Sequence, residues 1–373
     1  MRIGVATESV AGEARVAATA ETVKKLVAQQ HEVLVQAGAG LRAGVLDADY
    51  EAAGARLVDA AEALGAEVVL KVRRPEADEL ARMRAGAAVV GMLEPFHDEG
   101  LRAMAAAGLS AFALEAAPRT TRAQSLDVLS SQANIAGYKA VIVAADLYPR
   151  FMPMLMTAAG TVKAARVVIL GAGVAGLQAI ATAKRLGAVV EASDVRPAAR
   201  EQVESLGAKF IDVPFETEEE REIAQGVGGY ARPMPQSWLA RQAEQVAARV
   251  RQADIVISTA LIPGRRAPTL VSEEMVRSMR AGSVLVDMAA AQGGNCPLSE
   301  ADRVVVKHGV SIVGHTNLPS MMAADASSLY ARNVLDFLKL VLDKDKGLAI
   351  NLEDDIVNAC LVTHAGEVRR KSA

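Results

Sequence analysis

Apolar residues occur along the chain in short uninterrupted runs that alternate with segments of helical periodicity. Runs of four to eight such residues predict strands that are buried on both faces of a sheet. Five of them fall in the first third of the chain, at 2–7, 32–37, 67–72, 87–93 and 110–116. Between them, 19–30 and 98–108 have the helical period, and Gly108 predicts the end of the second helix. This alternation predicts an α/β unit with a mostly parallel sheet.

A second series of the same kind begins after residue 165. It follows a predicted long helix, about 131–147, that closes at Tyr148-Pro149. Residues 320–342 have helical spacing again, and the tail predicts irregular structure and strands around a turn at 364–366. The strands of the second series are predicted at 166–170, 188–193, 208–213, 254–258, 283–287 and 310–314.

The two series predict two Rossmann-like α/β domains with mostly parallel sheets, linked by long helices. Residues 134–319 would form one domain, and 1–133 together with 320–373 would form the other. A length of 373 residues and a hydrophobic content of 51% are sufficient for two large cores.

Composition excludes several classes of protein. The net charge is −3 and no long basic block occurs, which argues against nucleic acid as a partner. Cys296 and Cys360 are the two cysteines, so neither a disulfide framework nor a cysteine metal site is predicted and a reducing compartment fits. No apolar run approaches the roughly 18 residues that span a bilayer. We therefore expect a soluble chain, which leaves a membrane-bound partner possible.

The strongest local motif is a glycine turn, residues 171–176, between an apolar strand and a helix. Gly171 permits the tight turn, Gly173 lets the backbone approach a pyrophosphate, and Gly176 allows close packing of helix and strand. Asp194 follows the next strand, 194 − 171 = 23 residues beyond Gly171, where a carboxylate binds the adenine ribose. The motif predicts a dinucleotide site that prefers NAD(H), although Arg196 could neutralise a 2′-phosphate.

Two further segments break the apolar pattern. The polar segment, residues 119–131, reads RTTRAQSLDVLSS between Ala- and Val-rich stretches, and is either a solvated loop tip or a ligand-holding loop. Residues 214–235 combine a Glu cluster with glycines and prolines, and are either a surface loop or a lid.

A general acid or base, which most nicotinamide dehydrogenases need, is not obvious in the sequence. Structural roles are favoured for His31, His308 and His364, whereas His97 and His315 remain open. No Ser/His/Asp or metal-ligand constellation stands out.

Several motifs together resemble the NAD(H)-binding component of the proton-translocating NAD(P) transhydrogenase family. They are RTTRAQSLDVLSSQANIAGYKAV, TAAGTVKAARVVILGAGVAGLQAIATAKRLGA, TALIPGRRAP, GGNCPLSE and VGHTNLPS. The resemblance covers nearly the whole chain. It implies a separate soluble alpha subunit of a three-polypeptide enzyme.

The resemblance also assigns residues. The family's loop folds over the nicotinamide end of NAD(H), and its functional side chains match Arg119, Gln124, Asp127 and Ser130. The segment 214–235 becomes a mobile lid that closes with Tyr230 near the adenosine. The nucleotide-binding set is then Gly171, Gly173, Val174, Gly176, Asp194, Val195, Arg196, Gly229, Tyr230, Gln242 and Leu261.

The implied reaction is direct hydride transfer between NADH and NADP⁺ bound on a partner subunit. Such a step needs ring alignment and exclusion of water rather than an acid or base. The resemblance further implies a homodimer and membrane-spanning partner subunits that move the proton. It implies a cytoplasmic location, peripheral to the inner membrane through those partners. The apolar stretch 134–156 independently favours self-association.

Alanine dehydrogenase is the rival interpretation, because the N-terminus is similar to that family too. Arg15 occupies its substrate-carboxylate position. Three other catalytic positions differ: Arg73 replaces a lysine, Glu94 replaces the histidine, and Ala291 replaces an aspartate. A non-catalytic NAD-sensing module is a third possibility, although a sensor has no need of a nicotinamide-side loop.

Overall fold

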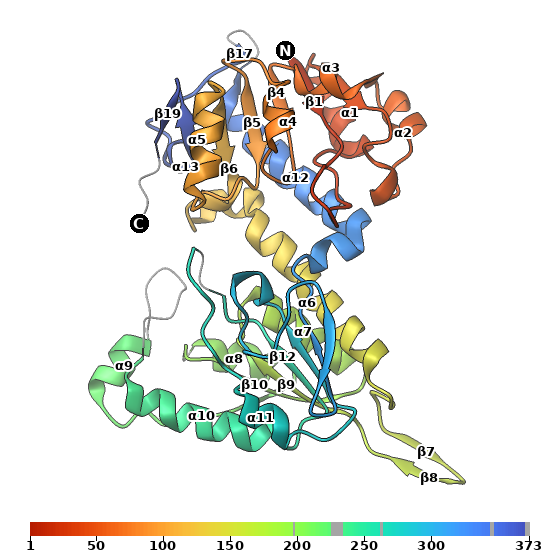
Figure 1. The fold of residues 1–373 in the computed structure, drawn as a ribbon, viewed down its shortest axis with the longest axis vertical. Helices are drawn as coiled ribbons and strands as arrows, with labels where there is room; N and C mark the ends of the chain where they lie inside the picture. Colours follow the sequence, from red (N-terminus) through yellow and green to blue (C-terminus); the bar gives the residue numbers. More distant parts are fainter. Residues whose placement is uncertain (197, 225–233, 262–263, 344–346, 370–373) are drawn as a thin grey trace. The chain divides into compact units, whose positions relative to one another are not determined.

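The computed structural model describes residues 1–196, 198–224, 234–261, 264–343 and 347–369. The chain divides into two compact units, Met1–Gln132 with Pro319–Ala373, and Ala133–Leu318 (Figure 1). Each unit contains one main sheet with helices on both faces. The predicted α/β class with two mostly parallel sheets is therefore confirmed.

The first unit contains an eight-stranded sheet in the order β19-β18-β6-β5-β4-β1-β2-β3. The six strands from β6 to the edge strand β3 are parallel, and the C-terminal hairpin pairs antiparallel with β6. The five apolar runs all form strands, whereas β3 is short and was not predicted. The bounds are β1 Arg2–Val5, β2 Glu32–Gln36, β3 Arg56–Val58, β4 Val68–Leu70, β5 Ala88–Gly91, β6 Ser110–Ala113, β18 Leu361–His364 and β19 Glu367–Val368.

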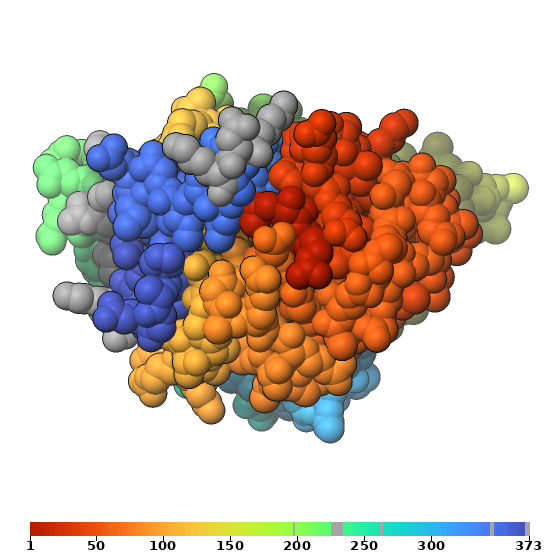
Figure 2. All heavy atoms as spheres, turned by 90° about the horizontal axis from the view of Figure 1, so that it is seen from above, coloured from red at the N-terminus to blue at the C-terminus, as the bar shows by residue number. Residues whose placement is uncertain are grey.

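Alternate strand residues of this sheet enter two different cores. Val33 and Val35 pack with α1 (Ala20–Ala28) and α12 (Ala323–Val341), whereas Leu34 packs with α3 (Ala60–Leu64) and α5 (Asp98–Ala106). The C-terminal segment completes the first of these cores, and Figure 2 shows it (blue) beside the N-terminal residues (red and orange). The shorter helices are α2 Asp47–Ala52, α4 Ala77–Leu80 and α13 Asp355–Cys360. The last lies in the tail, where irregular structure was expected.

The second unit contains a seven-stranded sheet in the order β11-β10-β9-β12-β13-β15-β14. Every pairing is parallel except that of β14, an antiparallel edge strand that the sequence analysis missed. The order reverses between β9 and β12, and this is the place where doubly wound sheets bind ligands. The bounds are β9 Arg166–Leu170, β10 Val189–Ser193, β11 Lys209–Phe210, β12 Ile255–Ser258, β13 Val284–Asp287, β14 Val304–Lys307 and β15 Val310–Val313.

Helices cover both faces of this sheet as well. One core contains side chains of α6 (Val128–Leu147), α7 (Val174–Arg185) and α8 (Ala198–Ser205), and the other contains those of α10 (Gln236–Val250) and α11 (Glu273–Ser278). Helices α6 and α7 approach closely, since a Cβ on Gly137 would lie 2.1 Å from the carbonyl oxygen of Ala175.

Three connections differ from the sequence-based expectation. The chain leaves the first unit along α6, but it returns through the 3₁₀ helix η5 (Leu318–Met322), directly before α12. The segment 214–235 is not simply a loop, because α9 (Glu218–Ala224) takes up its Glu cluster. Strands β7 (Leu155–Thr157) and β8 (Gly160–Val162) form a separate exposed hairpin. Among the described residues, no helix is both long enough and apolar enough to cross a membrane.

Candidate nucleotide-binding and alignment residues

The glycine turn follows β9, at the carboxyl edge of the second sheet. Gly171 has a φ of +103°, in the region that disfavours other residues. A Cβ on Gly171 would lie 2.4 Å from Oγ1 of Thr259, which itself donates to the carbonyl of Gly171 (3.1 Å). A Cβ on Gly176 would lie 1.8 Å from the same carbonyl oxygen. Both glycines are thus required by the packing of the turn itself.

Gly173 is different, because no contact within the described part of the chain requires a glycine there. A Cβ built there meets no atom of the described part of the chain within 4 Å, its chain neighbours and the backbone of α7 aside. Gly173 is the N-cap of α7, and as a glycine it brings no side-chain oxygen to the first-turn N–H groups. The space above Gly173 and these N–H groups fit the pyrophosphate of a dinucleotide.

Asp194 lies just past β10, and both of its carboxylate oxygens already accept hydrogen bonds. Oδ2 accepts from the Ala172 backbone N–H (2.7 Å), which ties Asp194 to the glycine turn. Arg196 donates to Oδ1 from its backbone N and its Nε, both at 2.9 Å. These bonds raise the pKa of Arg196. A ribose hydroxyl that binds Asp194 must therefore share the carboxylate with Arg196.

The remaining predicted nucleotide residues of the second unit lie around the same strand ends. Gln242 on α10 reaches the Ser193 hydroxyl at 3.4 Å, directly before Asp194. Val195 packs beside the buried cluster that contains Trp238. Val174 and Leu261 are exposed, as residues that meet a ligand rather than a core would be. Gly229 and Tyr230, and with them the lid hypothesis, lie outside the described residues.

Asn295 is a buried residue of this region that the sequence analysis missed. Its Nδ2 donates to the carbonyls of Ala260 (2.9 Å) and Pro268 (2.8 Å). Asn295 thereby fixes both ends of the segment that carries Leu261. The preceding Gly293 and Gly294 both have positive φ, so the paired glycines before an asparagine were the available signal.

The polar segment lies in the first unit and forms the 3₁₀ helix η3 (Thr121–Leu126) followed by the first turn of α6. Asp127 accepts hydrogen bonds from the backbone N–H of Ser130 (2.9 Å) and from its hydroxyl (2.6 Å). This is an N-cap, which fixes where α6 begins. The structure thus joins Asp127 and Ser130 directly.

Arg119 and Gln124 are exposed in the same segment. Arg122 forms ion pairs with Asp354 (2.7 Å) and Asp355, which anchor η3 to the start of α13. Asn333 on α12 anchors it from the buried side, because its Nδ2 donates to the Ser125 carbonyl at 2.7 Å. Asn333 lies about 200 residues away in sequence, and no sequence signal pointed to it.

His97 and His315, to which the sequence assigned no role, have different surroundings. Nδ1 of His97 accepts from the Gly100 backbone N–H at 3.0 Å, so His97 is the N-cap of α5. His315 is partly buried just beyond β15, beside Thr316, whose hydroxyl bonds to Asp302. Among the acids, burial raises the pKa of Glu115 to about 7.

Arg15, at the substrate-carboxylate position of the alanine dehydrogenases, is buried in bonds to protein groups. Its Nε and Nη2 donate to the two carboxylate oxygens of Glu13, at 2.7 and 2.6 Å. Its Nη1 donates to Gln132 (2.7 Å), and Arg73 pairs with Glu13 at 2.9 Å. A substrate carboxylate would have to displace these partners.

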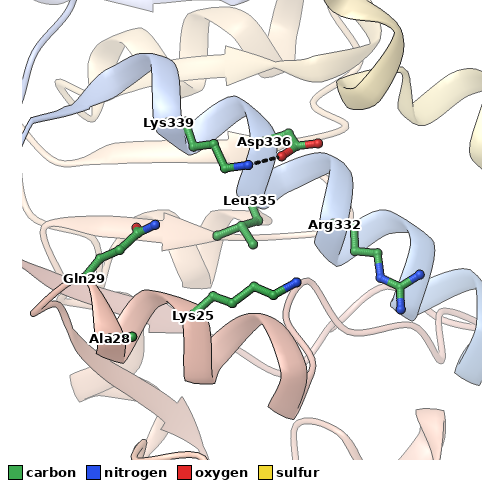
Figure 3. Close-up of a pocket in the computed structure, with 7 residues that line it drawn as sticks. All are labelled: Lys25, Ala28, Gln29, Arg332, Leu335, Asp336 and Lys339. Atoms are coloured by element: carbon green, nitrogen blue, oxygen red, sulfur yellow. Dashed lines mark hydrogen bonds and ion pairs between the residues drawn. The ribbon is translucent and has the colours of Figure 1, made fainter.

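A surface pocket between α1 and α12 contains none of the predicted site residues. It is lined by Lys25, Ala28, Gln29, Arg332, Leu335, Asp336 and Lys339 (Figure 3). Each of its three cations is ion-paired: Glu21 pairs with Lys25 and Arg332, both at 2.8 Å, and Asp336 pairs with Lys339. The pocket therefore offers a ligand no cation that lacks an acidic partner.

Two family models match the chain, one after the other. The N-terminal domain of alanine dehydrogenase/PNT matches residues 4–136, and its C-terminal domain matches 140–371. The chain belongs to the alanine dehydrogenase/PNT family. The resemblance inferred from the motifs is thereby confirmed.

Within this family the chain is more similar to transhydrogenase subunits than to alanine dehydrogenases. The first of the polypeptides that make up the NAD(P) transhydrogenase alpha subunit of Rhodospirillum rubrum is 51% identical, covering 99% of this chain and 97% of the relative. The crystal structure of a transhydrogenase from Sinorhizobium meliloti has a TM-score of 0.90 at 52% identity, covering 99% of this chain and 100% of the other. The alanine dehydrogenase of Halomonas elongata is 32% identical, covering 99% and 94%.

Proposed function

We propose that this chain is the NAD(H)-binding part of an NAD(P) transhydrogenase alpha subunit. One contrast between two positions supports this function over amino-acid oxidation. The glycine turn keeps an open position for a pyrophosphate at Gly173, whereas Arg15 is buried in bonds to Glu13 and Gln132. The open position at Gly173 supports nucleotide binding, while the arginine that would hold an amino-acid carboxylate is occupied.

In this proposal the second unit anchors the nucleotide. The N–H groups of the first turn of α7 bind the pyrophosphate, and Asp194 binds the adenine ribose. The carboxylate repels a 2′-phosphate, so NAD(H) is preferred over NADP(H). Gln242, Leu261, Val174 and Val195 line the nucleotide, and Tyr230 with Gly229 closes over it.

The polar segment of the first unit aligns the nicotinamide end. Arg119 and Gln124 supply exposed hydrogen-bond donors for the carboxamide, the ribose and the pyrophosphate side. Asp127 and Ser130, already joined at 2.6 Å, hold the segment in one conformation and orient the ring.

The chemical step is transfer of a hydride from C4 of the dihydronicotinamide of NADH to C4 of the nicotinamide of NADP⁺ on a partner subunit. NADH is oxidised, NADP⁺ is reduced, and no proton is exchanged. An acid or base is therefore unnecessary, and catalysis depends on holding two rings at near-attack distance away from water.

The proposed assembly contains a homodimer of this chain, an NADP(H)-binding component and membrane-spanning subunits. These partners would hold the chain at the cytoplasmic face of the inner membrane. The β7–β8 hairpin (Figure 1) supports self-association, because Leu155 and Met156 in it and Met154 directly before it are exposed, Met156 at 72%. Sedimentation at micromolar concentration should give a dimer. A species of 39.0 kDa alone would contradict it.

The proposed activity is tested by adding a separately purified NADP(H)-binding component to the full chain. Hydride exchange between NADH and an NADP⁺ analogue is the expected result. In a parallel reaction the chain alone is given NADH, pyruvate and ammonium. NADH oxidation in the parallel reaction, without exchange in the first, would favour alanine dehydrogenation instead.

A further inference from the structure

Helix α12 carries a row of three buried polar residues, spaced three apart, that each bind the backbone of a different loop. The Ser327 hydroxyl accepts from the Val16 N–H (3.0 Å) and the Tyr330 hydroxyl donates to the Lys71 carbonyl (2.7 Å). Asn333 completes the row with its 2.7 Å bond to the Ser125 carbonyl. Residues spaced in this way lie along one stripe of a helix. Helix α12 therefore binds three segments through this row: the polar segment and two loops that follow strands.

The orientation of the Asn333 amide is fixed by its partners. Its Oδ1 accepts from the Ser131 hydroxyl at 2.7 Å, while its Nδ2 faces the Ser125 carbonyl. A flipped amide would bring two carbonyl oxygens together at that same short distance, so the donor must point at Ser125. Asn333 is 8% exposed, and water does not substitute readily for either bond.

The bond from Asn333 to the Ser125 carbonyl stabilises the 3₁₀ helix η3 of the polar segment. A 3₁₀ helix is a weak structure, and its last carbonyls have no partner within the helix. Asn333 binds one of them in η3, and Asp127 caps α6 two residues later. Gln124 and Asp127 therefore lie on either side of a backbone atom held from the core of the first unit.

We propose that Asn333 is a positioning residue for hydride transfer, which fixes the polar segment so that Gln124 and Asp127 can align the nicotinamide ring. The inference rests on the proposed function. It predicts that the Nδ2 donor, rather than the volume of the side chain, is what transfer requires. Anchoring of the adenosine half of the nucleotide does not depend on it.

The isosteric variant Asn333→Asp tests the donor. It keeps the acceptor for Ser131 but places a carboxylate oxygen against the Ser125 carbonyl. In the full chain with its NADP(H)-binding component at pH 8, hydride transfer should fall about tenfold or more. NADH affinity should change by less than about threefold, roughly 0.65 kcal/mol. As pH falls, the protonated carboxyl can donate again, so the ratio of variant to wild-type rate should rise.

One control separates positioning from folding. Asn358→Asp introduces the same change at an exposed site on α13. It should transfer hydride at close to the wild-type rate. If Asn333→Asp does not fold, Ser131→Ala decides, because it frees the amide to rotate and should lower transfer about threefold with unchanged NADH affinity.

Wild-type transfer rates in Asn333→Asp at pH 8, or losses of rate and affinity in equal proportion, would overturn the inference. An unchanged rate in Ser131→Ala would do the same if Asn333→Asp does not fold. Absence of transfer by the wild-type complex is a separate result. It would overturn the proposed function, and the inference with it.

Discussion

The glycine turn and the polar segment differ in the chemical groups that they would present to a nucleotide. The turn is made of backbone: glycines that packing or a ligand requires, helix N–H groups and one carboxylate bound to the Ala172 N–H. The polar segment is made of side chains, held by Asn333, Arg122 and the Asp127 cap. Backbone amides suit the anchoring of phosphates, because their positions are set by the fold and do not vary with residue type. Side chains suit the alignment of a ring, because the type and position of each side chain can differ independently. The difference predicts that the two regions fail in different ways.

The largest effect should come from filling the open position of the glycine turn. The Cβ of Gly173→Val meets no described atom within 4 Å, its chain neighbours aside, so the melting temperature should hardly change. NADH affinity should fall about a hundredfold or more, roughly 2.7 kcal/mol, because the pyrophosphate loses its place. Isothermal titration and thermal melting measure both quantities.

Gly176→Ala is the matched control for this substitution. Its Cβ would collide with the Gly171 carbonyl, so the protein should lose about 1–3 kcal/mol of stability. Equal melting temperatures for the two variants would show that the turn does not divide into packing and ligand positions.

A smaller effect is expected for nucleotide selectivity. Asp194→Asn removes the charge that repels a 2′-phosphate and releases Arg196 from its 2.9 Å ion pair. A freed guanidinium binds phosphate well, so the preference for NADH over NADPH should shrink about tenfold, roughly 1.4 kcal/mol. The double variant with Arg196→Ala should lose most of that gain in NADPH affinity. Binding assays that give the same preference before and after Asp194→Asn would remove Asp194 from the selectivity mechanism.

The smallest expected effect is a dependence of folding stability on pH, and it arises from a residue of the first unit. Burial raises the pKa of Glu115 from its ordinary 4.5 to about 7, and its Oε1 accepts from the Glu94 N–H at 2.7 Å. An acid with a raised pKa favours folding while protonated, and this stability is lost as pH rises through about 7. Glu115→Gln cannot ionise. Its melting temperature relative to wild type should therefore be higher at pH 8 than at pH 5.

A Glu115→Gln variant whose difference from wild type is independent of pH would mean that this carboxyl does not titrate with folding.

Features that depend on local backbone geometry could be predicted from the sequence. The glycine turn is an example, since only glycine adopts φ near +103° at Gly171 or fits at Gly176. Buried parallel strands were equally visible as apolar runs. Strand β3, with three residues, and helix α13, with six, were missed because they are too short for their periodicity to stand out.

Features that depend on distant side chains could not be predicted. Asn333 lies about 200 residues from Ser125, and Asp354 lies 232 residues from Arg122. Such bonds follow from the packing of α12 and α13 against η3, which a single sequence does not record. The polar segment was visible as a break in the apolar pattern, but roles for its residues came only from the family resemblance. The elements that hold the segment required the structure.

The central claim is that the polar segment aligns the nucleotide while the glycine turn anchors it. Gln124→Ala in the full chain, assembled with its NADP(H)-binding component, tests it most directly. The rate of hydride transfer and the affinity for NADH should be measured on the same preparation, with Ser125→Ala as the exposed neighbouring control. We expect transfer to fall about a hundredfold while NADH affinity stays within about tenfold. Wild-type transfer in Gln124→Ala, or a fall in rate that a matching fall in affinity explains, would contradict the division between alignment and anchoring.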